Sequence, residues 1–177
     1  MRTESIAGSD TTAGAIRGTL LHIMTNPCTK NLPYLQAVIR EGMRVWPPVA
    51  NIFSRDVPAG GDTLVVDDES VFLPGGTCIG YSAYAMHQNE EIYGTDAEAF
   101  QPERWFESDQ AKLADMILTN DLMFGYGKLQ SLGKPVAQIE IGKTIFELLR
   151  NFDLALIRPT RPWDVRNLVG LFAISSM

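Results

Sequence analysis

The stretch with the clearest chemical potential is a glycine-punctuated loop at residues 124–133, with the sequence FGYGKLQSLG. It precedes a helix that the apolar spacing predicts over residues 135–152. A tight glycine loop ahead of a helix N-terminus brings the backbone close to a ligand. The pattern therefore predicts a ligand-binding loop, without naming the ligand. Its spacing is set by Phe124, Gly127, Ser131 and Gly133.

A second polar group lies near the start of a helix predicted over residues 6–25. Asp10 and Thr11 follow Gly8, and glycine in a helix interior costs about 1 kcal/mol relative to alanine, while Asp and Thr are poor helix formers. The simplest interpretation is that Ser9 or Asp10 caps the helix. A functional interpretation needs support from other parts of the chain.

Glu41 and Arg44 stand three residues apart in a helix predicted over residues 34–45, so both lie on one helical face. Such a pair is ordinarily solvated and contributes roughly 0.3–0.5 kcal/mol. A further arginine, Arg104, follows later in the segment FQPERW at residues 100–105. Each of these motifs is weak alone, but their order along the chain is specific.

Taken together, the motifs resemble the cytochrome P450 family, and most closely its fungal members with loops of the type FGYGxxQCLG. The resemblance extends from about residue 6 to the end of the chain. It implies a mainly α fold with small antiparallel β-sheets (α+β), corresponding to the C-terminal part of the P450 fold. It also implies haem as the family's cofactor and monooxygenation as its activity.

The resemblance assigns a role to both polar groups. In the family, an acidic residue and a threonine of the oxygen-binding helix deliver protons to bound oxygen, and Asp10 and Thr11 match these positions. The family's Glu-x-x-Arg pair is buried and locked to a later arginine, which makes Glu41, Arg44 and Arg104 a structural triad. Burying such charges is tolerable only when their pairing is complete, so a third partner is physically required.

The family's haem positions correspond to Phe124, Gly127, Ser131, Gly133 and Arg55, the last of which would bind a propionate. Ser131 is the decisive departure, because the family places its iron-ligating cysteine there. A thiolate is anionic and pushes electron density toward oxygen cleavage. A serine hydroxyl stays neutral and is a harder, weaker ligand for haem iron. We therefore expect haem binding to be weak or absent here.

The section between residues 45 and 124 reads as β-rich at first and then helical. We expect His87, within one of these helices, to be a structural residue. The predicted strands cover residues 49–57, 63–66, 71–73 and 77–83, the predicted helices cover 84–93 and 109–118, and a last strand covers 168–174.

Composition and charge restrict the classes of protein to which the chain can belong. The chain has 177 residues and a net charge of −6, with scattered Lys and Arg, which argues against a nucleic-acid partner. No apolar run approaches the roughly 18 residues that a membrane span needs, so we expect a cytoplasmic location if the chain folds. Cys28 and Cys78 are expected to be reduced, buried thiols. Together with His22 and His87 they show no zinc-type spacing.

Measured against the family pattern, residues 1–177 are expected to form a single partial domain. We expect the N-terminal half of the family fold, with its membrane anchor, to be absent, and the short junction at residues 26–32 predicts an internal deletion. The expected partners are a small apolar natural-product substrate and either a complete P450 or the missing N-terminal half. The latter would cover apolar faces that the truncation leaves open.

These features predict a degenerate, truncated P450-like protein without thiolate-haem monooxygenase activity. It would be retained as an inactive remnant or as a haem-independent cyclase or isomerase of secondary metabolism, acting by orienting a reactive substrate. The alternative is a haem-binding oxidoreductase or monooxygenase with an altered iron ligand. A further hypothesis is an interaction module that docks on a complete P450.

Overall fold

The structure, a computed structural model, describes residues 11–20, 23, 32–49, 52–156, 164–169 and 172–176. Residues 11–20 are helical, and they precede five labelled α-helices and three short 3-10 helices. The predicted mainly α fold with small antiparallel sheets is confirmed. The helices are α2 (Leu32–Val45), α3 (Ala83–His87), α4 (Glu90–Tyr93), η1 (Pro102–Phe106), α5 (Gln110–Asp121), η2 (Leu122–Phe124), η3 (Gly127–Leu129) and α6 (Lys134–Asn151).

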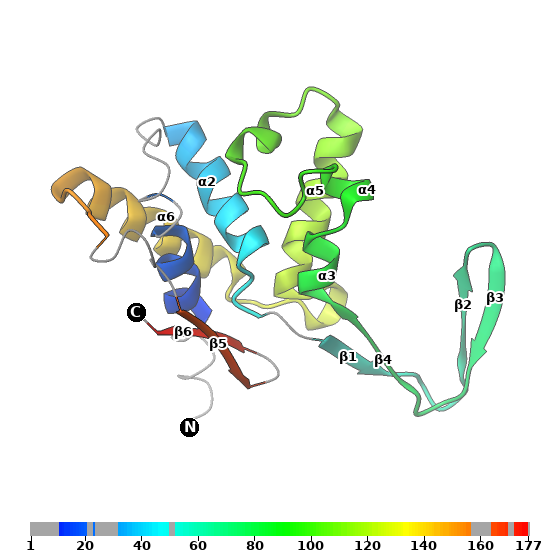
Figure 1. Cartoon of the computed structure of the whole chain (residues 1–177). Coiled ribbons are helices and arrows are strands. Elements are labelled where there is room, and N and C mark those ends of the chain that lie inside the picture. The colour runs from blue at the N-terminus through cyan, green and yellow to red at the C-terminus, as the bar shows by residue number, and fades with distance from the viewer. Residues whose placement is uncertain are drawn as a thin grey trace.

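Helix α2 is the centre of the helical body, where it contacts η1, α3, α5 and α6 (Figure 1). Its apolar residues fall on two faces, so that both faces are buried. The first face joins the inner side of α6 in the main core, which includes Leu35, Val38, Ile39, Met43, Ile141 and Ile145. The second face packs on a smaller core made of Ala37, Tyr93, Ala97, Trp105 and Met116.

The helix at residues 11–20 crosses α2 closely at Gly42. A Cβ atom placed on Gly42 would lie 2.7 Å from Thr19 Oγ1 and 3.2 Å from Thr19 Cα, and the Thr19 side chain is fully buried. Glycine is therefore required at this crossing for steric reasons, because the neighbouring helix backbone leaves no room for a methyl group.

Substituting Gly42→Ala is expected to lower the free energy of unfolding by about 1–3 kcal/mol, the usual cost of overpacking a tight core. Gly14→Ala is the matched control, because it lies in the helix at residues 11–20 and a Cβ there meets nothing within 4 Å. The control should be neutral or stabilise by up to about 1 kcal/mol through helix propensity. Urea unfolding followed by circular dichroism measures both, and equal midpoints would contradict the close crossing.

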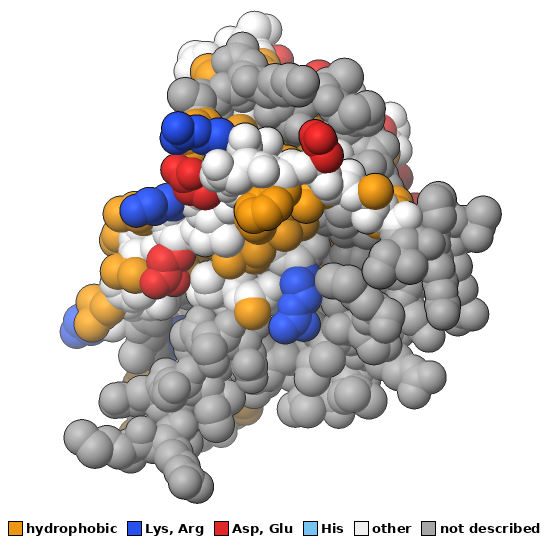
Figure 2. Space-filling model, turned by 90° about the vertical axis from the view of Figure 1, so that its left-hand side faces the viewer, with side chains coloured by type: hydrophobic (Ala, Val, Ile, Leu, Met, Phe, Trp, Pro, Cys, Tyr) orange, Lys and Arg blue, Asp and Glu red, His pale blue; other side chains and the backbone are white. Residues whose placement is uncertain are grey.

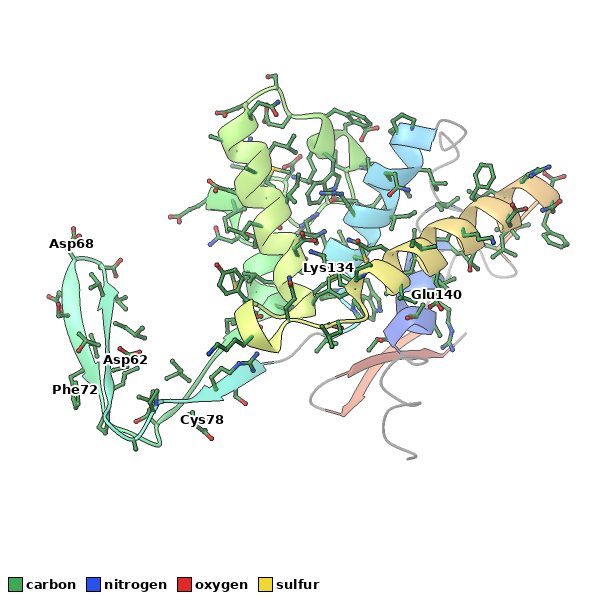
Figure 3. The ribbon with its side chains drawn as sticks, turned by 180° about the vertical axis from the view of Figure 1, so that it is seen from behind. Asp62, Asp68, Phe72, Cys78, Lys134 and Glu140 are labelled. Atoms are coloured by element: carbon green, nitrogen blue, oxygen red, sulfur yellow. The ribbon has the colours of Figure 1, made fainter. Side chains whose placement is uncertain are left out.

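Three two-stranded antiparallel sheets complete the fold. The sheet of residues 52–56 and 78–82 connects the helices to a second sheet. This second sheet is the hairpin of residues 62–73, which extends away from the helical body (Figure 1). The turn of this hairpin holds Asp67 and Asp68 at φ of 51° and 63°, and Figure 3 places Asp68 at its far tip. The pairs are β1 (Ile52–Asp56) with β4 (Cys78–Ser82), β2 (Asp62–Val66) with β3 (Glu69–Leu73), and β5 (Asp164–Val169) with β6 (Phe172–Ser176).

Three predictions about local structure are wrong. The single strand expected over residues 168–174 is instead divided between two antiparallel strands, β5 and β6. The helix expected over residues 84–93 is divided into α3 and α4, because Asn89 Oδ1 accepts the Glu91 N–H and starts a new helix. Cys78 is a free thiol, as expected, but it is exposed on β4 and not buried.

Candidate functional site

The carboxylate of Glu41 is the centre of a buried charge cluster on α2. Its two oxygens accept from Arg44 Nη2 at 2.8 Å and Arg44 Nε at 2.9 Å, in a bidentate pair. Arg104 Nε from η1 donates to Glu41 Oε1 at 3.0 Å. The carboxyl group is 0% exposed, so these charges attract each other across protein and not across water. The structure thus brings Glu41, Arg44 and Arg104 together.

Both arginines also bind backbone carbonyls of the chain between α3 and η1. Arg44 Nη1 donates to the carbonyls of His87 and Ala97. Arg104 Nη1 donates to the Tyr93 carbonyl at 2.6 Å. The carbonyls of His87 and Tyr93 end α3 and α4, and that of Ala97 follows α4, so the two guanidinium groups hold this part of the chain against α2.

Sequence reasoning missed three further members of the cluster. Trp105 Nε1 donates to Glu41 Oε2 at 3.0 Å, and the Gln101 backbone N–H donates to Glu41 Oε1 at 2.8 Å. Asp96 Oδ1 lies 3.3 Å from Arg104 Nη1 and is 48% exposed, so it partly balances the second positive charge. Trp105 follows Arg104 directly, and this adjacency is the one signal in the sequence that could have identified it.

The loop at residues 124–133 folds back on itself at the start of α6. The Ser131 N–H donates to the Phe124 carbonyl at 2.7 Å, and the Ser131 Oγ accepts the Gly133 N–H at 3.3 Å. Gly127 has φ of 63°, a left-handed conformation that favours glycine. Ser131 itself is exposed and stands two residues before Gly133, the residue that caps α6.

Lys134 fixes the first turn of α6 to the end of α5. Its Nζ lies 2.8 Å from Asp121 Oδ2 and 5.8 Å from the centre of the Phe124 ring. The ion pair and the cation–π contact hold both ends of the loop, so the loop spans two anchored helices.

The remaining predicted site residues lie elsewhere. Thr11 is the first described residue of the helix at residues 11–20, where it is half-buried, and Asp10 lies outside the described residues. Arg55 is exposed on β1, where its Nη1 donates to the Ser54 carbonyl at 2.8 Å. The oxygen-activation and propionate roles of these residues therefore stay predictions.

The donor atoms of the loop do not fit a thiolate-ligated haem. Residues 124–133 contain no cysteine, and Ser131 offers a neutral hydroxyl oxygen. Cys78 belongs to β4, away from the loop in sequence and in fold. Within the described part of the chain, no group of three or more His, Cys, Asp or Glu side chains could hold a metal ion.

His87, next to the charge cluster, is a fully buried imidazole. Burial lowers the pKa of His87 to about 4, and the positive charge of Arg44 adds to this effect, although the Thr119 carbonyl opposes it. Its Nε2 lies 3.3 Å from the Thr119 carbonyl oxygen. The side chain is therefore neutral at physiological pH and acts as a packing residue, as the sequence predicted.

This neutral state predicts acid sensitivity. In the unfolded chain the imidazole has a pKa of about 6.5, so below that pH the unfolded state binds the proton more readily than the folded state. The folded state is expected to lose about 3 kcal/mol between pH 6.5 and pH 4. His87→Gln should remove this part of the pH dependence. Urea unfolding at several pH values measures it, and an unchanged pH slope in the variant would contradict the assignment.

Comparisons with known proteins agree with the arrangement of these elements. The cytochrome P450 family model matches residues 27–176. A P450 monooxygenase, aba1, from Botryotinia fuckeliana is 37% identical over 198 residues, covering 97% of this chain and 38% of the relative. Pisatin demethylase from Fusarium vanettenii is 34% identical over 179 residues, covering 89% of this chain and 33% of the relative.

Solved structures give the same result for the fold. The crystal structure of a cytochrome P450, CYP102L1, matches with a TM-score of 0.78 and 26% identity, over 97% of this chain and 41% of that one. P450BioI, solved in complex with an acyl carrier protein bearing hexadec-9Z-enoic acid, matches with a TM-score of 0.70 at 21% identity and supports the fold alone.

These matches cover nearly all of this chain but less than half of each relative. The chain spans between 33% and 41% of the length of these relatives and solved structures. None of the helices that the structure describes has the length and apolar character needed to cross a membrane. With a family model over residues 27–176 and a relative 37% identical over nearly all of its length, the chain belongs to the cytochrome P450 family.

Proposed function

We propose that this chain is a P450-derived protein without thiolate-haem monooxygenase activity of its own. The observation that carries the proposal is Ser131, which stands where the resemblance puts the family's iron-ligating cysteine. Its Oγ accepts the Gly133 N–H, so a neutral hydroxyl faces the N-terminus of α6. A neutral oxygen does not supply the anionic sulfur that drives oxygen cleavage.

The proposal includes a partial domain with an internal deletion near residues 26–32. Supporting it, the match to the Botryotinia fuckeliana relative runs over 198 residues, although this chain has only 177. The relative therefore carries residues inside the matched stretch that this chain lacks. Most of the proposed junction lies outside the described residues.

Haem-independent catalysis, as in a cyclase or isomerase of secondary metabolism, has limited support from the charged side chains. Glu41 accepts five hydrogen bonds, which commits it to structure. Glu103 is exposed and accepts from the Tyr34 hydroxyl at 2.6 Å. Asp10, the acidic residue to which the resemblance assigns proton delivery, lies outside the described residues. An inactive remnant therefore ranks above a retained enzyme.

The second candidate function is a haem-binding oxidoreductase with an oxygen ligand at the iron. It is favoured by the loop itself, which is closed by the Ser131 N–H and the Phe124 carbonyl at 2.7 Å and turned at Gly127. A loop closed in this way would hold haem through an oxygen ligand at the iron. We further propose a cytoplasmic location and, for any retained binding, a small apolar natural-product substrate.

An optical titration of the purified chain with haem separates the candidates. The main proposal expects no saturable change in the Soret band, or weak binding with the spectrum of an oxygen-ligated iron. Tight saturable binding with an oxygen-ligand spectrum would favour the second candidate. A thiolate-type spectrum in the wild-type protein would overturn both.

A further inference from the structure

The hairpin of β2 and β3 is a two-stranded sheet with both faces exposed. Every residue of β2 is exposed, and so are residues 69–72 of β3. Apolar side chains lie among them, with Val65 70% exposed and Phe72 64% exposed. A hairpin of two strands is at best marginally stable in water, because independent stability needs three or more strands with an apolar face. Within the part of the chain that the structure describes, no third strand joins this sheet.

Strand β3 forms the outer edge of the hairpin. Figure 1 shows β2 on the side of the helical body and β3 on the far side. The view from behind in Figure 3 agrees, because Asp62 of β2 lies nearer the helices than Phe72 of β3. Among the described strands, β3 pairs with β2 alone, so its outer edge presents main-chain N–H and C=O groups. Such an edge is a template for pairing with another strand.

The turn of the hairpin indicates which main-chain groups point outward. Both turn residues, 67 and 68, have positive φ, which is the pattern of a type I′ turn, and Val66 pairs with Glu69 across it. This flanking pair exchanges hydrogen bonds, and hydrogen-bonded pairs alternate with non-hydrogen-bonded pairs along an antiparallel ladder. The main-chain N–H and C=O groups of Ser70 and Phe72 are therefore directed away from β2.

The β3 sequence is complementary to itself when two copies run antiparallel. Pairing Ser70 with Phe72 of a second copy uses the outward N–H and C=O groups of both residues. It also places the small serine side chain opposite the large aromatic ring. Val71 then lies on the two-fold axis, next to the same residue of the second copy. Because Val71 pairs with Leu64 across the hairpin, one apolar stripe would cross all the strands of the combined sheet.

The charges of the hairpin favour this antiparallel arrangement. Residues 67–69 are Asp, Asp and Glu, and Figure 3 shows Asp68 at the far tip. Two copies paired in parallel would bring their acidic tips together, and like charges opposite each other destabilise a sheet. Antiparallel pairing keeps the tips at opposite ends and places Glu69 opposite Leu73 of the second copy. The β2 edge faces the helical body, so a two-fold interface through β3 closes at two copies.

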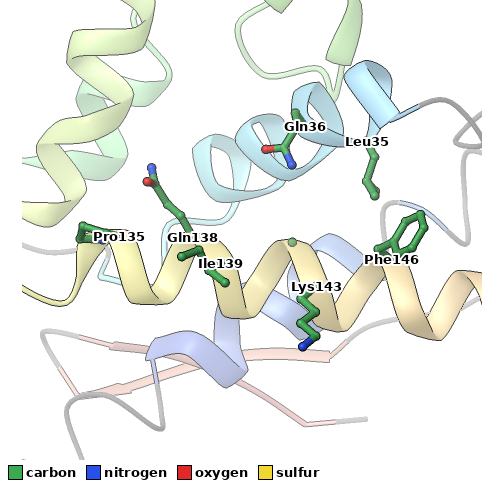
Figure 4. Close-up of a pocket in the computed structure, with 8 residues that line it drawn as sticks. Leu35, Gln36, Pro135, Gln138, Ile139, Lys143 and Phe146 are labelled. Atoms are coloured by element: carbon green, nitrogen blue, oxygen red, sulfur yellow. The ribbon is translucent and has the colours of Figure 1, made fainter.

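Another apolar surface lies on the helices, in a groove between α2 and α6. Figure 4 shows Leu35 on α2 and Phe146 on α6 at this groove, and Ile139 adds a further apolar side chain. Figure 2 shows hydrophobic side chains on this side of the molecule next to Lys, Arg, Asp and Glu side chains. Helices offer side chains alone, because their main-chain groups are bonded within the helix. The β3 edge offers main-chain groups as well, so it is the stronger site for a second copy.

We infer that two copies of this chain associate through β3 and form a four-stranded antiparallel sheet in the order β2–β3–β3–β2. The interface is one short strand pair with its flanking side chains, which is small for a protein–protein contact, so the dimer dissociates on dilution. It uses neither the Glu41 cluster nor the loop at residues 124–133. The inference is therefore independent of whether the chain binds haem.

Sedimentation equilibrium of the purified 177-residue chain over a wide range of concentrations tests the inference. We expect a reversible equilibrium between monomer and dimer. Val71→Glu places two like charges together at the axis and should weaken dimerisation by about tenfold or more. Ser70→Pro removes an outward N–H, which an edge strand tolerates, and should also weaken dimerisation. Val65→Glu is the matched control, because it adds the same charge on β2, away from the interface, and should leave the dimer intact.

Two further measurements separate a lost interface from a hairpin that fails to fold. An equal mixture of the Val71→Glu and Val71→Lys proteins should dimerise again, because opposite charges then meet at the axis. In a background with Cys28→Ser and Cys78→Ser, Val71→Cys should form a disulfide-linked dimer in oxidised glutathione. Residues paired at a non-hydrogen-bonded position have Cα atoms about 4.5 Å apart, which suits a disulfide. Val65→Cys in the same background should form none.

Several results would overturn the inference. One is a chain that stays monomeric at every concentration, and another is a dimer that tolerates both β3 substitutions. A dimer weakened equally by Val65→Glu and Val71→Glu would also contradict it. So would a dimer that Ile139→Glu disrupts, since α6 would then form the interface.

Discussion

Replacing Glu41 with glutamine is expected to lower the free energy of unfolding by about 3–5 kcal/mol, the usual cost of removing one partner from a buried ion pair. Glutamine retains the shape but not the charge, so the guanidinium groups of Arg44 and Arg104 stay buried without their shared carboxylate. Its amide nitrogen would also face donors such as Trp105 Nε1, which now donates to Glu41 at 3.0 Å. Because whole domains are stabilised by only about 5–15 kcal/mol, this is a large fraction of the total.

Glu98→Gln provides the control, because Glu98 is exposed and lies in the same stretch between α4 and η1. It should change the unfolding free energy by less than about 0.5 kcal/mol. Chemical denaturation of the three proteins gives the comparison. If the two glutamine variants unfold at the same denaturant concentration, the Glu41 cluster does not hold the fold as described.

Replacing Ser131 with cysteine is expected to change the way the chain binds added haem. The substitution restores sulfur at the loop position that precedes α6, and a thiol next to a helix N-terminus ionises more readily than a free one. The variant should bind haem at least tenfold more tightly than the wild-type protein, which corresponds to about 1.4 kcal/mol. It should also show a thiolate-type band after reduction and treatment with carbon monoxide.

This comparison needs two matched variants. Cys78 is an exposed free thiol, so all proteins in the series carry Cys78→Ser to remove adventitious haem binding. Ser131→Ala controls for loss of the hydroxyl without gain of sulfur, and it should behave like the parent. Equal haem affinity and equal spectra for the cysteine and alanine variants would show that the loop does not present residue 131 to the iron.

The charge cluster shows how much of the site could be predicted from the sequence. The family resemblance carried by Glu41, Arg44 and the FQPERW segment predicted that Arg104 meets the pair. The remaining partners were not predictable. Carbonyls of residues such as His87 and Ala97 become acceptors only because the chain from the end of α3 to η1 passes over α2. That path depends on tertiary packing, which local patterns do not encode.

The helices and strands agree with the apolar patterns in the sequence where only one face of the element is buried. The apolar spacing predicted a helix over residues 135–152, and in α6 Ile141 and Ile145 are buried on one face. Val136 and Ile139 are apolar but exposed, which a single stripe with a period of 3.6 residues does not predict.

One boundary was missed although its signal was present. Asn89 before two glutamates is a readable start of α4.

The most direct test of the account is the absorption spectrum of the wild-type protein mixed with haem, reduced and treated with carbon monoxide. The account predicts no thiolate-type band, because Ser131 supplies no sulfur at the loop. A thiolate-type band from the wild-type chain, persisting after Cys78→Ser, would contradict it.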